Sequence, residues 1–290
     1  MPFASPRHFF TVNVEDYFHE RALEPYVARA SWAGRPSRIE RNVDLLLGLL
    51  AKHEARATFF TLGWIAEHHP GVVRAIARAG HEIASHGATH RRLDELSPEQ
   101  FRDEVRSSKL LLEDLTGTQV VGFRAPNFSI VPGSEWAFDV LLEESYEYDS
   151  SRLPIDRPSY GSPISPRYPH AVRCESVGAS LVEIPLTTLD VMGSRMPAGG
   201  ASLRHLPYAA VRGAFRAAER AGVPGVFYVH PWEMDPEQPR IPMSLATRMR
   251  HYGGLARTAP RLGRLLEEFQ FGSIASALPH LVQNAPAIAA

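Results

Sequence analysis

Two histidines four residues apart are the part of this sequence best suited to chemistry. His86 and His90 stand directly after an apolar run that is typical of a strand. Two imidazoles at this spacing can share one helical turn and point the same way, so that both reach one divalent cation at about 2.0–2.1 Å. The chain has 13 histidines, so such a pair also arises by chance. By itself the pair is a weak signal for a metal site.

A metal site would also need a carboxylate, and the chain offers two early ones. Glu15 and Asp16 close an apolar stretch that begins at His8. Adjacent acids at the end of a strand also cap a following helix, because carboxylates accept the free N–H groups of its first turn. The acids and the histidines therefore indicate a metal site only if the fold brings them together.

Length and composition favour an ordinary soluble protein. A chain of 290 residues with 44% hydrophobic and 22% charged residues can bury a large core. The net charge of −1, without a block of like charges, argues against binding nucleic acid. Cys174 is the sole cysteine, which excludes an internal disulfide and fits a reducing compartment. We find neither a Sec-type signal nor an apolar stretch of about 20 residues, and expect a cytoplasmic protein.

Strand-like and helix-like segments alternate from the start of the chain, which predicts a parallel α/β sheet or barrel. The expected strands are 9–14, 57–62, 82–85, 120–123, 181–186 and 226–230, and the expected helices are 39–53, 72–79, 98–117, 135–145, 208–221 and 261–269. Prolines deny regular structure to residues 150–169. A loop of that length in a compact enzyme is more often part of a binding surface than a linker.

Several chemically able residues follow these strands directly. The pair Glu15 and Asp16, the pair His86 and His90, Arg124, and His230 each stand at the carboxyl end of an expected strand. Ligands gather at that edge of parallel sheets and barrels. We therefore expect these side chains to converge on one rim.

Four segments together resemble the polysaccharide deacetylases of the NodB-like fold, known as carbohydrate esterase family four. They are Val14-Glu15-Asp16, Ser85-His86-Gly87-Ala88-Thr89-His90, Arg124-Ala125-Pro126-Asn127-Phe128 and Val229-His230-Pro231-Trp232. The narrower likeness is to the deacetylases of exopolysaccharide loci associated with exosortase and PEP-CTERM systems. The resemblance implies a distorted (β/α) barrel in one domain, 1–290, with the motifs in 1–150 and a subgroup-specific half, 151–290, completing the barrel.

The resemblance also implies a metal centre. Asp16, His86 and His90 would hold the ion. Zinc is the default for two imidazoles, one carboxylate and a water, although the same set accepts cobalt or nickel. The implied reaction is hydrolysis of an N-acetyl group from an amino sugar, with release of acetate.

The remaining roles follow from the same resemblance. Glu15 would be the general base that takes the proton of the water, and Arg124 would orient that base by a charge-assisted fork. His230 would protonate the leaving amine, with Asp190 as a candidate to orient it. Asp149 is expected to brace a turn. The expected substrate contacts are Pro126, Asn127, Trp232 and Tyr17, and residues 150–169 and 196–200 would shape an extended groove.

One departure from the subgroup leaves the roles of the acids open. We expect an aspartate where this chain has Asn13, and asparagine cannot take a proton at neutral pH. If the functional acids are the first and third of that run, Asn13 replaces the base and Glu15 is the metal ligand. The alternatives are a catalytically impaired carbohydrate-binding homologue and a metal-free hydrolase of a small cyclic amide or ureide.

The expected partner is an N-acetylated saccharide, either an exopolysaccharide or its lipid-linked precursor. Exopolysaccharide is finished outside the cell, whereas the sequence favours a cytoplasmic protein. Action on a lipid-linked intermediate at the cytoplasmic face of the inner membrane would reconcile the two. Neither nucleic acid nor a transmembrane segment is expected.

Overall fold

The computed structural model describes residues 8–157, 160–191 and 193–289. Its main sheet has ten strands in the order β10-β1-β2-β3-β4-β5-β7-β6-β12, with β11 paired to β1. Neighbouring strands run parallel, except that β6 and β7 are antiparallel. The strands are β1 His8–Val14, β2 Thr58–Thr61, β3 Glu82–Ser85, β4 Gly122–Phe123, β5 Tyr148–Asp149, β6 His170–Cys174, β7 Ala179–Glu183, β10 Gly225–Val229, β11 Phe271–Gly272 and β12 Ala287–Ala289. A separate hairpin joins β8 Thr188–Val191 to β9 Ser194–Pro197.

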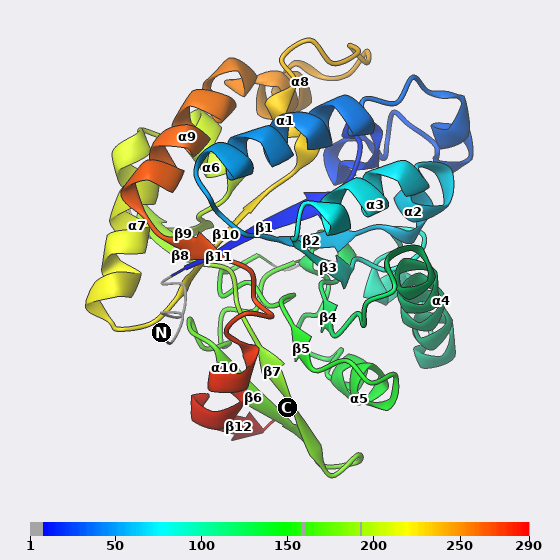
Figure 1. Ribbon diagram of the computed structural model, residues 1–290, viewed down its shortest axis with the longest axis vertical. Coiled ribbons are helices and arrows are strands. Elements are labelled where there is room, and N and C mark those ends of the chain that lie inside the picture. The colour runs from blue at the N-terminus through cyan, green and yellow to red at the C-terminus, as the bar shows by residue number, and fades with distance from the viewer. Residues whose placement is uncertain (1–7, 158–159, 192, 290) are drawn as a thin grey trace.

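Helices surround the strands as an outer layer (Figure 1). They are α1 Ile39–Lys52, α2 Gly63–His68, α3 Pro70–Arg78, α4 Pro98–Thr116, α5 Trp136–Glu143, α6 Gly200–His205, α7 Tyr208–Arg220, α8 Leu245–Tyr252, α9 Thr258–Glu268 and α10 Leu278–Asn284. The α/β class predicted from the sequence is confirmed. Within the described residues the sheet has two ends, β10 and β12, so its ladder of hydrogen bonds is not a closed ring.

The central strand β1 is buried along its whole length. Phe10 and Val12 pack into the larger apolar cluster shared with the helices, whereas Phe9 belongs to a second cluster with Phe60 and Val226 of the neighbouring strands. A strand covered on both faces must be apolar on both, which is typical of parallel sheets. This packing places the carboxyl end of β1 in the interior of the molecule.

Local sequence signals fix α4 most clearly. Ser97 and Gln100 form a capping box, Pro98 opens the helix, and Gly117 ends it in the left-handed conformation with φ 67°. The capping box and Gly117 satisfy backbone groups that the helix ends leave free, and Pro98 lacks the N–H that would otherwise need a partner. The predicted helix over 98–117 is thereby confirmed, and it matters for the site because α4 carries Glu104.

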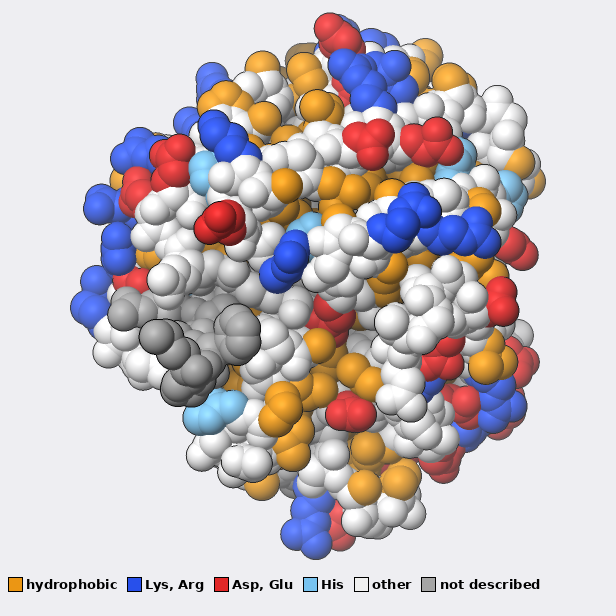
Figure 2. Space-filling model, in the orientation of Figure 1, with side chains coloured by type: hydrophobic (Ala, Val, Ile, Leu, Met, Phe, Trp, Pro, Cys, Tyr) orange, Lys and Arg blue, Asp and Glu red, His pale blue; other side chains and the backbone are white. Residues whose placement is uncertain are grey.

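The Pro-rich stretch 150–169 has neither helix nor strand among its described residues, as predicted. No helix of the described part of the chain is long and apolar enough to cross a membrane. Figure 2 shows acidic and basic side chains interspersed over the visible face, in line with the net charge near zero.

Candidate active site

Glu15, His86 and His90 form a buried group at the carboxyl ends of β1 and β3. The Oε1 atom of Glu15 lies 2.9 Å from Nε2 of His86 and 3.3 Å from Nε2 of His90. One ligand atom from each of the three side chains lies within 4.8 Å of the others, so the group could hold one metal ion. The predicted convergence of these strand ends is thus present in the structure.

The hydrogen bonding of His86 shows that this group suits a cation. Nδ1 of His86 lies 2.7 Å from the carbonyl oxygen of Arg124. A carbonyl can only accept, so Nδ1 carries the hydrogen and a neutral ring directs the lone pair of Nε2 at Glu15. Two lone pairs at 2.9 Å repel each other unless a proton or a metal ion lies between them. A carbonyl that fixes the tautomer of a histidine is also a usual support for a metal ligand.

The electrostatics of the group agree with this reading. Burial lowers the pKa of His86 and so favours the neutral, ligating ring. Burial acts to raise the pKa of Glu15, but His90, His86 and His230 outweigh it and hold the pKa well below its usual value. Glu15 is therefore ionised at neutral pH, as a metal ligand must be.

The histidines sit on a loop, not on the helical turn that their spacing predicts. The chain turns at Gly87, with φ 75°, and His90 itself has φ 59°. Glu104 of α4 holds the loop, because its carboxylate accepts the N–H groups of Ala88 and Thr89. Contacts with α4 thus bring the two imidazole rings together. The sequence prediction had attributed this proximity to a helical turn.

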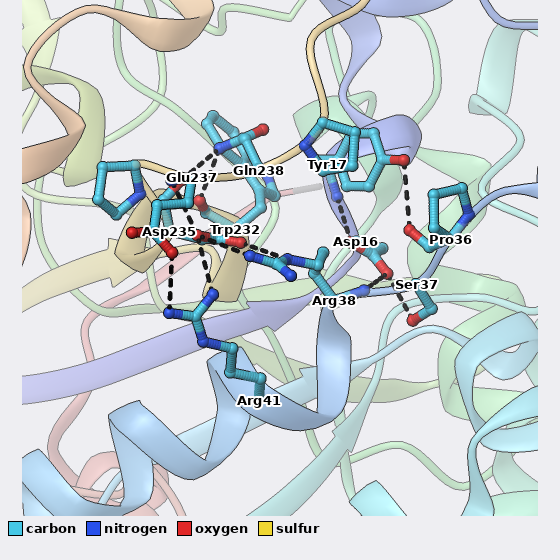
Figure 3. Close-up of polar contacts among 12 residues, drawn as sticks. Asp16, Tyr17, Pro36, Ser37, Arg38, Arg41, Trp232, Asp235, Glu237 and Gln238 are labelled. Carbon is cyan, nitrogen blue, oxygen red and sulfur yellow. Dashed lines mark hydrogen bonds and ion pairs between the residues drawn. The ribbon is translucent and has the colours of Figure 1, made fainter.

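Asp16 does not join the two histidines, which corrects its predicted role as a ligand. Its carboxylate accepts the N–H of Tyr17 at 2.8 Å, the hydroxyl of Ser37 at 2.7 Å and the N–H of Arg38 at 2.8 Å. Figure 3 shows Asp16 directed towards the segment before α1. Glu15 is the residue beside the histidines, because Asp16 caps the short helix Tyr17–His19 that starts where β1 has ended.

The same segment braces the chain after His230. Arg38 binds the buried carboxylate of Asp235 at 2.8 Å, and Arg41 adds a second contact at 3.5 Å (Figure 3). Asp235 directly follows the short helix Pro231–Met234. Asp16 therefore supports the site indirectly. It fixes the segment before α1, and Arg38 of that segment binds Asp235.

Arg124 reaches Asn13 and not Glu15, which corrects its predicted contact. Its guanidinium is fully buried and donates to the Asn13 side-chain oxygen at 2.9 Å, to the Thr11 hydroxyl at 2.9 Å and to Ser150. All of these acceptors are neutral. Burial lowers the pKa of Arg124 to about 9, which reflects a cation without a carboxylate bonded directly to it. Position 13 is thus where a counter-ion of this arginine would lie.

A buried pair of acids supports the strand that carries Arg124. Asp149 accepts both the N–H and the hydroxyl of Ser151, whose oxygen accepts the N–H of Ala125. Asp149 thus holds the chain directly after β5. Burial raises the pKa of Glu183 well above its usual value, and neighbouring Asp149 adds to that rise. Burial beside a second carboxyl group therefore favours the protonated form of Glu183 in the folded protein.

We expect Glu183→Gln to make the stability of the protein less sensitive to pH. A raised pKa in the folded state gives stability that is complete below the pKa of the unfolded chain, about 4.3, and is lost as pH rises through the folded pKa. The unfolding free energy of the natural protein should therefore fall from about pH 5 upward more steeply than that of the variant. Urea titrations across this range measure the slope. Glu175→Gln is the control, since that side chain is 86% exposed, and equal slopes for all three proteins would contradict the raised pKa of Glu183.

His230 stands beside the metal-binding group and is oriented by Glu233. Nε2 of His230 lies 3.9 Å from Oε1 of Glu15, and its Nδ1 lies 3.2 Å from Oε2 of Glu233. Burial lowers the pKa of His230, but the bond to Glu233 and the charge of Glu15 outweigh it and raise the pKa to about 9. Arg204 holds the other oxygen of Glu233 at 2.9 Å. In the metal-free site His230 is therefore a charged proton donor at neutral pH.

Glu233 replaces Asp190 as the partner of His230, which corrects the sequence prediction. Asp190 lies on the hairpin β8–β9 and pairs with Arg167 and Arg195 at the surface. The signal that could have identified Glu233 is its spacing, since a glutamate three residues after a strand end can cap the helix that begins there. Glu233 accepts the backbone N–H of His230 in that way.

A cleft of about 620 Å³ opens over this group. Asn13, Glu15 and His230 lie in its wall, together with apolar and aromatic side chains. The predicted groove-forming segments contribute Leu153, Tyr160, Met196 and Pro197, and the other aromatic members are Phe128 and Tyr228. A largely apolar cleft with a few polar groups at one place is the usual form of a small-molecule or saccharide site.

Of the four predicted substrate contacts, Asn127 lines the cleft and three others do not. Asn127 has φ 56°, a strained value for a residue with a side chain, and its Nδ2 atom is buried without a hydrogen-bond partner. Trp232 is only 3% exposed and stacks on His230 and His251 behind the cleft. Tyr17 and Pro126 are buried as well. Core packing thus accounts for Trp232, Tyr17 and Pro126.

Two family profiles match the chain. Residues 34–134 match the Polysaccharide deacetylase family, and residues 150–279 match a domain of unknown function, DUF3473. The first region contains His86, His90 and Arg124, and the second contains His230 and Glu233. The single sheet combines strands from both regions, because β5 pairs with β7 and β1 pairs with β10.

Known proteins with similar sequence and structure agree with these profiles. A peptidoglycan deacetylase of Helicobacter pylori is 30% identical over 46% of this chain and 43% of its own length. The chain thus spans less than half of this curated relative. A putative polysaccharide deacetylase from Mycobacterium smegmatis superposes with a TM-score of 0.63 at 20% identity, covering 99% of this chain and 95% of that chain. An allantoinase, Puue, gives 0.62 at 17% identity, covering 99% and 93%. At these identities the two structures show a shared fold and no more.

Proposed function

We propose, on the premise that residues 34–134 are a polysaccharide deacetylase region, that this chain is a metal-dependent N-deacetylase. Its substrate would be a saccharide with N-acetylhexosamine residues, and acetate would be released. The observation that carries the proposal is the lone pair of His86 Nε2 facing the Glu15 carboxylate at 2.9 Å. A metal ion between the two atoms would remove their repulsion, and burial, which lowers the pKa of His86, disfavours a proton in that place.

Glu15, His86 and His90 would hold the metal ion, for which we propose zinc because imidazole and carboxylate donors suit it. A zinc ion in such a site lowers the pKa of a bound water and polarises the oxygen of the acetamide. The carbonyl of Arg124 keeps the His86 ring in the ligating tautomer. The protein thus supplies a preorganised ligand set in a buried setting.

His230 would deliver the proton that the leaving amine needs. Its Nε2 atom faces the site, while Glu233 holds Nδ1 and stabilises the charged ring. Arg204 in turn fixes Glu233. A positioned acid of this kind contributes roughly 10²–10⁴-fold to a reaction rate. We assign His230 the role of general acid.

Removal of the proton from water is the step for which the site is least equipped. Asn13 occupies the place beside Arg124 and cannot accept a proton. Glu15, which the family resemblance implied as the general base, lies among the proposed metal ligands. We therefore propose slow hydrolysis, limited by the lack of a carboxylate at position 13.

The form of the cleft supports a saccharide substrate. Phe128, Tyr160 and Tyr228 present aromatic surface near the reacting groups, and aromatic side chains can stack on pyranose rings. The side-chain nitrogen of Asn127, which lines the same cleft and has no hydrogen-bond partner, could donate to a sugar oxygen. We propose an exopolysaccharide or its lipid-linked precursor as the source of this saccharide.

Acetate release from N-acetylglucosamine oligomers tests the proposal. Protein stripped by a chelator should release no acetate, and zinc or cobalt should restore release. Magnesium is the control, since it prefers oxygen ligands and suits this donor set poorly. Release that does not depend on metal would contradict the proposed mechanism.

The Asn13–Arg124 contact also favours a second function, the binding of saccharides without hydrolysis. A protein whose base has been replaced by asparagine could bind the same saccharides without hydrolysing them. Isothermal titration with the oligomers would then show binding, while the metal-loaded protein released no acetate. This outcome would assign the cleft to recognition.

A further inference from the structure

We propose that helix α8, Leu245–Tyr252, docks this protein on an anionic lipid surface. The docking goes beyond the proposed function, because it concerns a surface outside the reacting groups. In Figure 1 α8 lies at the upper rim of the molecule, at the opposite end from α10 and β12. Four observations carry the proposal, and they concern apolar exposure, the arrangement of the helix face, charge, and continuity with the cleft.

Large apolar side chains on and near α8 are exposed to solvent. Leu245 is 72% exposed and Met249 is 65% exposed. Tyr26 adds an aromatic ring that is 38% exposed, and its hydroxyl accepts the N–H of Ser244, the residue that caps α8. An isolated exposed leucine is ordinary, but two aliphatic side chains and a tyrosine at one place form a patch.

The order of residues around α8 matches a helix that lies flat on a membrane. At about 100° per residue, Met249 and Leu245 are neighbours on one face. Arg248 and Arg250 stand about 100° to either side of Met249. His251 is on the opposite side, where it is buried against Trp232 and Gln238. An apolar centre with arginines on both flanks is the pattern of an interfacial helix.

The sequence segment that contains this helix is rich in arginine, and the cleft wall that it shares also holds the acidic side chain Glu20. Residues 238–266 contain six arginines, at 240, 248, 250, 257, 261 and 264, and no aspartate or glutamate, in a chain whose net charge is −1. Arg261 and Arg264 are engaged elsewhere, with backbone carbonyls and with Glu268. Arg248 and Arg250 make no ion pair with any described residue. A surface of this charge is complementary to anionic headgroups.

The patch is continuous with the cleft. Met249 and Arg250 belong to the same cleft wall as Glu15 and His230. A membrane in contact with α8 would therefore lie at the mouth of the cleft. If the proposed function holds, the acetylated sugar would reach the site on a carrier held in that membrane. The docking itself does not depend on catalysis.

Co-sedimentation with lipid vesicles tests the proposal on the full chain. We expect binding to vesicles of equal parts phosphatidylcholine and phosphatidylglycerol, and none to phosphatidylcholine alone. Leu245→Asp combined with Met249→Asp should abolish binding. Arg248→Gln combined with Arg250→Gln should weaken it, by roughly fivefold for each arginine, and added salt should weaken binding of the natural protein.

Leu110→Asp is the matched control, because Leu110 is 60% exposed on α4 and makes no part of the α8 patch. It should leave vesicle binding unchanged, and circular dichroism should show each variant folded. Failure of the natural protein to bind anionic vesicles would overturn the proposal. It would also be overturned if the α8 variants bound normally, or if they abolished self-association in sedimentation velocity and not vesicle binding. None of these readouts uses acetate release, so the proposed function is tested separately.

Discussion

Asn13→Asp should raise the turnover number for acetate release by roughly 10²–10⁴-fold, the usual contribution of a positioned general base. The substitution changes one atom and adds a carboxylate to the cleft wall. Arg124 Nη1 lies 2.9 Å from the side-chain oxygen of Asn13, so the buried guanidinium would hold the new carboxylate ionised. The gain should appear in kcat and not in KM, because proton removal occurs in the transition state.

The control for this gain removes the arginine as well. Asn13→Asp combined with Arg124→Gln should lose most of the increase, since a buried carboxylate without a cation takes up a proton and ceases to be a base. Asn13→Ala should stay at or below the natural rate. If Asn13→Asp remains silent while its metal content matches that of the natural protein, the binding function gains support over the hydrolase.

Glu15→Ala should mainly lower metal affinity, whereas Asp16→Ala should mainly lower stability. Glu15→Ala removes one donor of the proposed ligand set, and its zinc affinity should fall by more than the roughly 10–100-fold that loss of a supporting contact costs. Asp16→Ala should leave zinc affinity within a few-fold and lower stability by about 0.5–2 kcal/mol, since it removes a capping side chain.

A chelator competition titration and thermal unfolding of the metal-free proteins separate the two effects. Both variants delete a buried carboxylate from adjacent positions, so each serves as the control for the other. If Asp16→Ala abolished zinc binding and Glu15→Ala preserved it, the assignment made from family resemblance would stand and the geometric one would be wrong.

Much of the fold could be predicted from the sequence because it depends on interactions between residues that are close in the chain. Ser97, Pro98 and Gly117 bound α4 through capping chemistry that involves only near neighbours. The apolar run before Glu15 becomes a strand buried on both faces. The short strands β8 and β9 were not predicted. Their strand conformation depends on hydrogen bonds with each other and not on a pattern in their own residues.

The sequence by itself determined the α/β class and the strand ends that carry the chemistry, because these follow from alternation and from residue type. Only the tertiary structure decided which of two adjacent acids faces the histidines. β1 ends at Val14, so Asp16 turns away to cap a helix while Glu15 stays at the site. Likewise, a contact between distant segments selected Asn13 as the partner of Arg124. Such choices depend on distances between elements, which no local pattern in the chain records.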